Sequence, residues 1–280
     1  MALGPQSSLV LSLLLTPALL AAGDRRKSQA DESPPAPEDV LFEPLPAVEA
    51  AALHAQDLKD APANVTVVTR QEIRRYGYRT LAEVLAQVRG FYMSSDSICY
   101  YAGVRGFSLP GDYNSRILVM LNGHQLTDNV YRAMYMFGQD FGLDMDLVER
   151  IEIVRGPFSA LYGSNGIFAA LNIVTRSPVD APRARAGLEL GSFGETKLSL
   201  ASSLYLGGGA NLLVAASGFH TAGRSLELAE PDAPEGYYGR IAGAGREQGY
   251  HSFAQLLWKD WSFTAYFIPD FRFKHLGATL

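Results

Sequence analysis

Hydrophobic and polar residues alternate one by one along much of the C-terminal half of the chain. Residues 184–191 place Ala or Leu at every second position, with Arg, Gly or Glu between them. Residues 197–204 repeat the alternation with Leu and small polar residues. Segments of about ten residues with this period, separated by turns, are typical of transmembrane β-strands. The same interpretation covers three further segments, Asn211–His220, Tyr250–Trp258 and Trp261–Phe273.

The connections between these segments are alternately short and long. Gly207-Gly208-Gly209 and Lys259-Asp260 predict tight turns, whereas Thr221–Gly249 is long, polar and rich in Gly, Pro and Glu. Membrane barrels combine short turns on one side with long loops on the other. A soluble β-sandwich can carry the same alternation, so these strands alone leave both folds open. The aromatic residues that suit a lipid interface are Trp258, Trp261, Tyr266 and Phe271.

The preceding part of the chain has a different period, which predicts short helices. Val65–Val68 is a β-branched strand, and Thr69–Glu72 is a capping box that opens a helix ended by Gly77. Thr80–Glu83 repeats the capping box, and Gly90 is the predicted end of the second helix. The apolar face of that helix consists of Leu81, Val84, Leu85 and Val88.

Residues 148–176 predict a strand, a one-turn helix and a second strand. The strands are Ile151–Val154 and Leu171–Thr175, and both are rich in β-branched or aliphatic residues. Gly156-Pro157 sets a turn with Pro in the first helical position, and Gly163 suits a left-handed cap. The glycine spacing alone is equally compatible with an ordinary β-turn-α-turn-β element of another α+β domain.

The order of these motifs resembles the plug domain of TonB-dependent outer-membrane receptors. Val148–Arg176 resembles the end of that domain, and Val104-Arg105-Gly106-Phe107 resembles its Ile-Arg-Gly-Phe element. Ile117–Gly123 resembles its strand and Asn-Gly turn, and Asp60-Ala61-Pro62-Ala63 resembles its start. The resemblance covers Asp57–Pro178.

These observations predict an α+β plug domain, a small mixed sheet with short helices, followed by antiparallel transmembrane β-strands of an incomplete β-barrel. We expect the plug at residues 57–178 and the first barrel strands at 184–280. The resemblance implies a barrel of about 22 strands, whereas the C-terminal segment supplies about five. An open edge leaves backbone groups unpaired in hydrocarbon. We therefore expect the chain to be a fragment, a prematurely terminated copy or the product of a cloning boundary.

The first 56 residues predict export and a flexible tether. Leu9–Leu20 is an apolar run of signal-peptide length, and Leu20–Gly23 supplies small residues for cleavage, although no Lys or Arg precedes the run. We predict a signal peptide at 1–23 and a Pro-rich periplasmic tether at 24–56. The resemblance implies a TonB box in the tether, for which Val48-Glu49-Ala50 is the best, though not a convincing, candidate.

Composition excludes several classes of protein. The 280 residues are 48% hydrophobic, which excludes global disorder. With 24 basic and 29 acidic residues, and a net charge of −5, the chain has no electrostatic footprint for nucleic acid. The single cysteine, Cys99, can form neither an intrachain disulfide nor a thiolate cluster, and we expect a small loop residue. Beyond the N-terminus, no window reaches the ~18 apolar residues of a spanning helix.

The sequence offers no catalytic or metal-binding constellation, so we expect no enzyme activity, no cofactor and no metal. Asp144 and Asp146 resemble a paired-carboxylate acid/base site, but an N-terminal helix cap explains them more simply. The histidines show no metal-ligand spacing, and we expect each to be solvated. They are His54, His124, His220, His251 and His275.

Two sets of residues are candidate functional sites. The resemblance implies ligand binding on the outward loops of the plug, where aromatic side chains would be costly to expose without a partner. Packing against the barrel wall explains each of these side chains equally well. The predicted patch for a metal chelate or similar nutrient is Tyr100, Tyr101, Arg132 and Tyr135. The resemblance also implies a latch between plug and barrel, with Arg105, Glu149, Glu152 and Arg155 as members.

The resemblance implies an importer of the bacterial outer membrane, in contact with its lipid. Such a receptor binds a siderophore-iron, cobalamin or similar nutrient and imports it when the TonB-ExbB-ExbD complex remodels the plug. Two alternatives remain at this stage: a soluble periplasmic plug-like binding or interaction module, and a non-functional receptor fragment.

Overall fold

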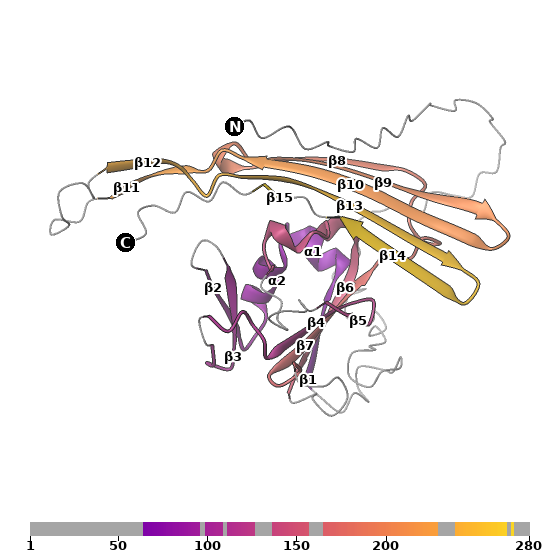
Figure 1. Ribbon diagram of the computed structural model, residues 1–280, viewed down its shortest axis with the longest axis horizontal. Coiled ribbons are helices and arrows are strands. Elements are labelled where there is room, and N and C mark those ends of the chain that lie inside the picture. The colour runs from indigo at the N-terminus through magenta and orange to yellow at the C-terminus, as the bar shows by residue number, and fades with distance from the viewer. Residues whose placement is uncertain are drawn as a thin grey trace, which may run out of the picture. The chain divides into compact units, whose positions relative to one another are not determined.

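The computed structural model contains two large sheets of different character, a short-stranded one and a long-stranded one, and two separate two-stranded hairpins (Figure 1). It describes residues 64–95, 99–108, 111–126, 136–156, 165–228, 239–267 and 270–271. The predicted signal peptide at 1–23, the predicted tether at 24–56 and the helical turn predicted after Pro157 lie outside these residues. Those three expectations therefore stay predictions.

The first sheet has five strands and mixed direction. Its central strands β6 and β7 are antiparallel, β4 runs parallel to β7, and β1 and β5 form the edges. The small mixed sheet predicted for a plug is confirmed, and β6 and β7 are both longer than predicted. In spatial order the strands are β1 (Asn64–Thr69), β6 (Val148–Arg155), β7 (Ala169–Thr175), β4 (Ile117–Leu121) and β5 (His124–Gln125).

The first helix, α1 (Arg70–Tyr76), has the predicted capping box. Thr69 Oγ1 accepts a hydrogen bond from the backbone N–H of Glu72 at 3.3 Å, and the Glu72 carboxylate accepts one from the Thr69 N–H at 2.8 Å. Gly77 ends the helix with a φ of 67°, in the left-handed region that glycine tolerates.

The second helix, α2 (Leu81–Gln87), forms without a complete capping box. The Thr80 hydroxyl caps the Glu83 N–H, as predicted, but the Glu83 carboxylate bonds the N–H of Arg79 at 2.7 Å. The Arg79 guanidinium, 2.8 Å from that carboxylate, holds it there. The helix also ends before Gly90, because its last turn closes on Val88. Among the described residues, no helix has the length and apolar character to cross a membrane.

Two hairpins depend on left-handed turn residues. Asn122-Gly123 joins β4 to β5 with φ values of 49° and 78°, the geometry of a type I′ turn. β2 (Phe91–Ser95) pairs antiparallel with β3 (Tyr100–Val104). The second left-handed turn comes after β3, where Arg105-Gly106, with φ values of 53° and 86°, let Val104 pair with Phe107. The Arg-Gly element is therefore a tight turn, and it places the Arg105 side chain at the surface.

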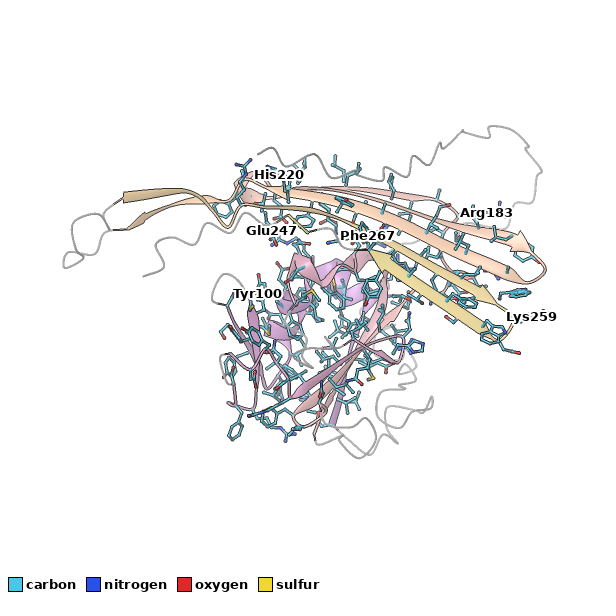
Figure 2. All side chains as sticks on the ribbon, in the orientation of Figure 1. Tyr100, Arg183, His220, Glu247, Lys259 and Phe267 are labelled. Carbon is cyan, nitrogen blue, oxygen red and sulfur yellow. The ribbon has the colours of Figure 1, made fainter. Side chains whose placement is uncertain are left out.

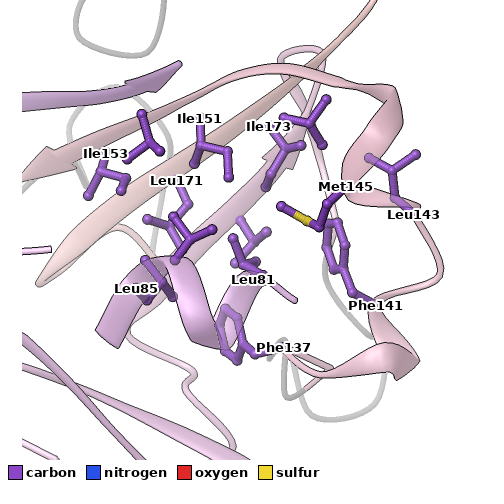
Figure 3. Packing of buried hydrophobic residues seen from close by; sticks show 14 of the residues in the cluster. Leu81, Leu85, Phe137, Phe141, Leu143, Met145, Ile151, Ile153, Leu171 and Ile173 are labelled. Carbon is purple, nitrogen blue, oxygen red and sulfur yellow. The ribbon is translucent and has the colours of Figure 1, made fainter. Parts of the chain in front are cut away.

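The core of the first sheet lies between α2 and the central strands (Figure 3). Leu81 and Leu85 on α2 have no exposed surface. Burying side chains of this size contributes about 1.5–3 kcal/mol each. Because a seven-residue helix is marginal by itself, this packing is what stabilises α2. The strand residues opposite, also fully buried, are Ile151, Ile153, Leu171 and Ile173.

The second sheet consists of long antiparallel strands in the order β8-β9-β10-β13-β14, with β15 also paired to β13 (Figure 1). The predicted succession of antiparallel strands is confirmed. The strands are β8 (Arg185–Leu190), β9 (Thr196–Gly207), β10 (Ala210–Thr221), β13 (Glu247–Trp258), β14 (Trp261–Phe267) and β15 (Asp270–Phe271).

Residue-by-residue alternation gives these strands two different faces, with side chains standing on both (Figure 2). Leu188 and Leu190 on β8 are 70% and 74% exposed, whereas Arg185 and Glu189, on the other face of the strand, are half-buried. Leucines of β9 are exposed in the same way. One face is therefore apolar and uncovered, as a lipid-facing wall requires.

Two details of the predicted strands are wrong. The predicted loop Thr221–Gly249 contains a hairpin of β11 (Arg224–Leu228) and β12 (Gly239–Ala244), because pairing depends on the partner strand more than on composition. The single strand predicted at Trp261–Phe273 is instead β14 and β15. Pro269 lies between them in the sequence, and proline cannot donate a ladder hydrogen bond.

We predict that Leu85→Ala destabilises the first sheet by about 2–5 kcal/mol, since it opens a cavity under α2. Urea unfolding of the purified protein measures the change. Gln87→Ala, at an exposed position of the same helix, is the matched control and should change stability by less than about 0.5 kcal/mol. Equal effects of the two substitutions would show that α2 is not held by this core.

Candidate functional site

A buried ion pair joins the two sheets. Asp144 precedes the 3-10 turn η3 (Met145–Leu147), and its Oδ1 lies 2.8 Å from Nζ of Lys197 on β9. The Asp144 and Lys197 side chains are only 5% and 7% exposed. Burial removes water from both charges, so such a pair contributes little net stability but is costly to break on one side.

Further contacts cross the same boundary, which we call the seam. Arg185 on β8 donates from Nη2 to Oδ1 of Asp146 at 2.6 Å. Glu189 on β8 lies 3.3 Å from the Lys197 ammonium and adds a second carboxylate to it. Other seam contacts include an ion pair of Arg79 with Glu195 and a hydrogen bond from Thr175 Oγ1 to Gln255 Oε1.

The two aspartates reach the seam because η3 is a tight turn. The Asp144 carboxylate accepts the N–H of Asp146 at 3.0 Å, which confirms the predicted cap. Met145 and Leu147 are buried in the hydrophobic core, while the aspartates two residues apart face the strand sheet. The cap residue therefore also serves as an ion-pair partner, a role that the sequence reasoning missed.

Strand register brings the polar residues of the sheet together at the seam. Gly187, Ser199, Ser217 and His251 are cross-strand neighbours on β8, β9, β10 and β13. Because neighbours in a sheet point to the same face, the polar side chains of this row all face the plug-like part. Lys197 lies two residues from Ser199 and therefore on the same face.

A cavity of about 30 Å³ lies at the seam, and Asp144, Ser217 and His251 are among its lining residues. Each of the three is 6% exposed. Three of their atoms, Asp144 Oδ2, Ser217 Oγ and His251 Nδ1, have no hydrogen-bond partner among the described protein atoms. Buried polar atoms are normally paired, so their convergence on one cavity requires an explanation.

The expectation that every histidine is solvated is wrong for His251. The register of β13 places it on the covered face, where its ring lies 5.4 Å from that of Phe219. His124, on the edge strand β5, is exposed as expected. Cys99 lies in the connection directly before β3, as expected of a loop residue, and its side chain is buried.

The predicted latch residues have other partners within the plug-like part. Glu152 is fully buried and lies 2.8 Å from Arg150, and Glu149 lies 3.6 Å from Arg176. Arg155 donates to the carbonyl of Arg89 at 2.6 Å, to Thr66 Oγ1 at 2.6 Å and to Asn64 Oδ1. Within the described ranges, the two most buried ion pairs of the seam, Asp144–Lys197 and Asp146–Arg185, place the carboxylates on the plug and the cations on the strands. The Arg79–Glu195 pair has the expected polarity, but Arg79 was not among the predicted latch residues.

Arg155 nevertheless belongs to a cluster of cations. Burial lowers the pKa of Arg155, and the neighbouring positive charges of Arg105 and Arg89 lower it further. In the described part of the chain, no carboxylate lies within ion-pair distance of Arg155 or Arg105. A latch through these two arginines to other barrel strands stays a prediction.

The structure separates the members of the predicted ligand patch. Tyr100 and Tyr101 are successive residues of β3, so their side chains point to opposite faces of the hairpin. Tyr101 is buried, and Tyr100 (labelled in Figure 2) is half-buried and packs against the core. The concave patch cannot therefore contain both rings on one surface. Arg132 and Tyr135 lie outside the described residues, so their part in ligand binding stays a prediction.

One sequence signal could have located the seam. Lys197 stands in a predicted membrane strand, where a charged residue has to face the barrel interior and find a partner. Its partner on the plug could not be read from the sequence, because Asp144 is 53 residues away and reaches it only through the tertiary fold.

Known proteins resemble this chain in both sequence and fold. Residues 57–170 match the family described as TonB-dependent Receptor Plug Domain. The chain is 30% identical over 132 residues to an iron-regulated outer membrane virulence protein of Vibrio cholerae, covering 46% of this chain and 20% of the relative. It is 26% identical over 219 residues to the vitamin B12 transporter BtuB of Vibrio vulnificus, covering 75% of this chain and 34% of the relative.

Solved structures show the same fold. FpvA of Pseudomonas aeruginosa superposes with a TM-score of 0.59 at 17% identity, covering 78% of this chain and 26% of that one. FyuA of Yersinia pestis superposes with a TM-score of 0.52 at 18% identity, covering 73% of this chain and 31% of that one. The chain thus contains a TonB-dependent receptor plug domain followed by strands with the fold of the receptor barrel. It spans about a fifth to a third of the two curated relatives described above.

We predict that Lys197→Met destabilises the docked plug by about 3–5 kcal/mol, because it leaves the buried Asp144 carboxylate without its cation. Faster proteolysis of the plug in membrane preparations and a lower midpoint of urea unfolding would report the change. Combining Lys197→Met with Asp144→Asn should restore most of the loss. Glu189→Gln removes the more exposed partner of the same lysine and should cost less than about 1 kcal/mol. An equal loss in the Glu189 variant would contradict the central role of the buried pair.

Proposed function

We propose that the chain is the plug and first barrel strands of an outer-membrane receptor that imports a nutrient in a TonB-dependent manner. The observation that carries the proposal is a plug docked on a strand sheet through charges, while the opposite face of the sheet is apolar and uncovered. An apolar outer face suits lipid, and a polar inner face suits a lumen that the plug must be able to leave.

The character of the seam supports gated transport over a permanent seal. An obligate seal is normally apolar, like a domain core divided in two. Here a small apolar contact of Leu213 and Phe253 is combined with buried ion pairs. The ion pairs give a specific docked position with little net stabilisation, which favours a boundary that a force or a competing contact can open. The plug keeps its own hydrophobic core under α2 when the seam opens. No bond is made or broken in this proposal, which assigns no enzyme activity to the chain.

The proposed energy source is the TonB-ExbB-ExbD complex, acting through the tether at residues 24–56. β1, the first described strand after the tether, is an edge strand paired only to β6 in the five-stranded sheet. Force on the tether would therefore act first on the hydrogen bonds between β1 and β6. The relatives are named for vitamin B12 transport and iron regulation, which supports a metal chelate as the class of ligand.

The cation cluster of Arg155 and Arg105 supports a second fastening, to carboxylates of other barrel strands. We expect Arg155→Ala to increase proteolysis of the plug and leakage of small solutes through the outer membrane. Arg75→Ala, at an exposed position of α1, is the control and should not increase leakage. Unchanged leakage in the Arg155 variant would remove the proposed latch.

Deletion of the natural gene that encodes this chain should abolish uptake of one labelled metal chelate from a panel of ferric siderophores and cobalamin. The same uptake should be lost in a strain without TonB, and the protein should fractionate with the outer membrane. Recovery in the soluble periplasmic fraction would favour a plug-like binding module. Unchanged uptake of every compound in the panel would contradict import of a metal chelate.

A further inference from the structure

Three unpartnered atoms belong to residues that line one cavity from both sides of the boundary. Asp144 Oδ2 comes from the plug, and Ser217 Oγ and His251 Nδ1 come from adjacent barrel strands. A fourth lining residue, Arg176, has an Nε without a hydrogen-bond partner, but this atom lies 3.6 Å from the Glu149 carboxylate, which compensates its charge. Ser217 and His251 are directly opposed in the β10–β13 ladder. Leaving one buried polar group unpaired costs about 1–3 kcal/mol, so three together favour a shared polar partner.

The hydrogen-bond partner of His251 on the plug fixes which nitrogen carries hydrogen. The imidazole bonds the backbone carbonyl of Gln139, and a carbonyl can only accept. Because Nδ1 is the nitrogen without a partner, Nε2 donates to Gln139. In the neutral ring, Nδ1 is then an acceptor, as is Asp144 Oδ2, while the Ser217 hydroxyl can donate.

We propose that a single structural water occupies this cavity and bridges the plug to the barrel wall. The water would donate one hydrogen to His251 Nδ1 and the other to Asp144 Oδ2, and would accept the hydroxyl hydrogen of Ser217. This arrangement uses both hydrogens of the water and satisfies all three atoms. About three hydrogen bonds are usual for a buried water, and the cavity of about 30 Å³ exceeds the minimum for one molecule.

The charges around the cavity favour a neutral ligand. Asp144 is paired with Lys197, Asp146 with Arg185, and the lining residue Arg176 with Glu149. An added ion would therefore meet no uncompensated partner. Within the described ranges, no group of His, Cys, Asp or Glu residues is arranged to hold a metal ion.

The bridge makes the seam sensitive to protonation of His251. Protonation turns Nδ1 from an acceptor into a donor, so the water can no longer donate to it. It also places a cation in a buried site near the Lys197 ammonium, and the Asp144 carboxylate, which is already paired with Lys197, offsets that cost only in part. The 3-10 turn η2 (Gln139–Phe141) contributes the Gln139 carbonyl and the Asp140 carboxylate, which bonds the Gly138 N–H. The ordinary imidazole titrates between about pH 5 and 8, so acidification in this range should loosen the docked plug.

A high-resolution structure of the unaltered protein at neutral pH tests the bridge directly. We expect one water oxygen about 2.7–3.2 Å from each of Asp144 Oδ2, Ser217 Oγ and His251 Nδ1. A direct contact between His251 Nδ1 and Asp144 Oδ2, or an ion in place of the water, would overturn the proposal. The position of this water does not depend on nutrient uptake. The bridge can therefore be disproved while the import proposal holds, and import can be disproved while the bridge holds.

Proteolysis of the docked plug as a function of pH tests the effect of His251 protonation. Cleavage of a denatured substrate, measured at the same pH values, corrects for the change in protease activity with pH. The unaltered protein should be cleaved about tenfold faster at pH 5.5 than at pH 7.5, the effect of losing one buried hydrogen bond. His251→Gln keeps a hydrogen-bond donor and acceptor in the side chain but cannot titrate, so it should abolish the difference in cleavage rate between the two pH values. His220→Gln, on the neighbouring strand β10, should retain it. A difference that persists in the His251 variant, or is absent from the unaltered protein, would overturn the pH dependence.

Discussion

The two faces of the long strands are the constraint on which the rest of the structure depends. Every residue of these strands faces either the apolar outer side or the plug, since side chains alternate with a period of two. A slip of one residue in β9 would turn Lys197 outward and bring leucines against the plug. The ion pairs, the polar row at Ser217 and the cavity all require the observed register.

The plug is stabilised in two physically different ways. Its interior is apolar, with α2 packed on β6 and β7, and this burial makes it a folded unit. Its contact with the strand sheet combines buried charges and hydrogen bonds with apolar packing of Leu213 and Phe253 against the same core. The charges define the docked position without adding much net stability. The combination suits a domain that must stay folded while it docks and undocks.

Local signals were sufficient for most elements of the fold. The capping box at Thr69, the turn at Asn122-Gly123 and the alternating strands all appear where the sequence predicts them. These features depend on neighbouring residues, whose spacing the sequence displays. The capping box of α2 and the β11–β12 hairpin were mispredicted, because a competing ion pair decided the first and a partner strand the second.

The candidate site was less accessible to sequence reasoning than the fold. The plug motifs and the turn at Arg105 were visible, yet the partners of Glu149, Glu152 and Arg155 in the structure lie within the plug. Asp144 could be identified as a cap, but not as the partner of Lys197. Tyr100 and Tyr101 were grouped by proximity in the chain, although strand geometry separates successive side chains.

The sequence by itself determined the class of fold, the alternating faces of the strands and the capped helices, because each arises from interactions between residues close in the chain. Only the tertiary structure decided which charges meet at the seam and which histidine is buried. Those outcomes depend on the register between strands and on contacts between residues more than fifty positions apart, such as Asp144 and Lys197. A one-dimensional pattern shows the period of such strands but not their partners.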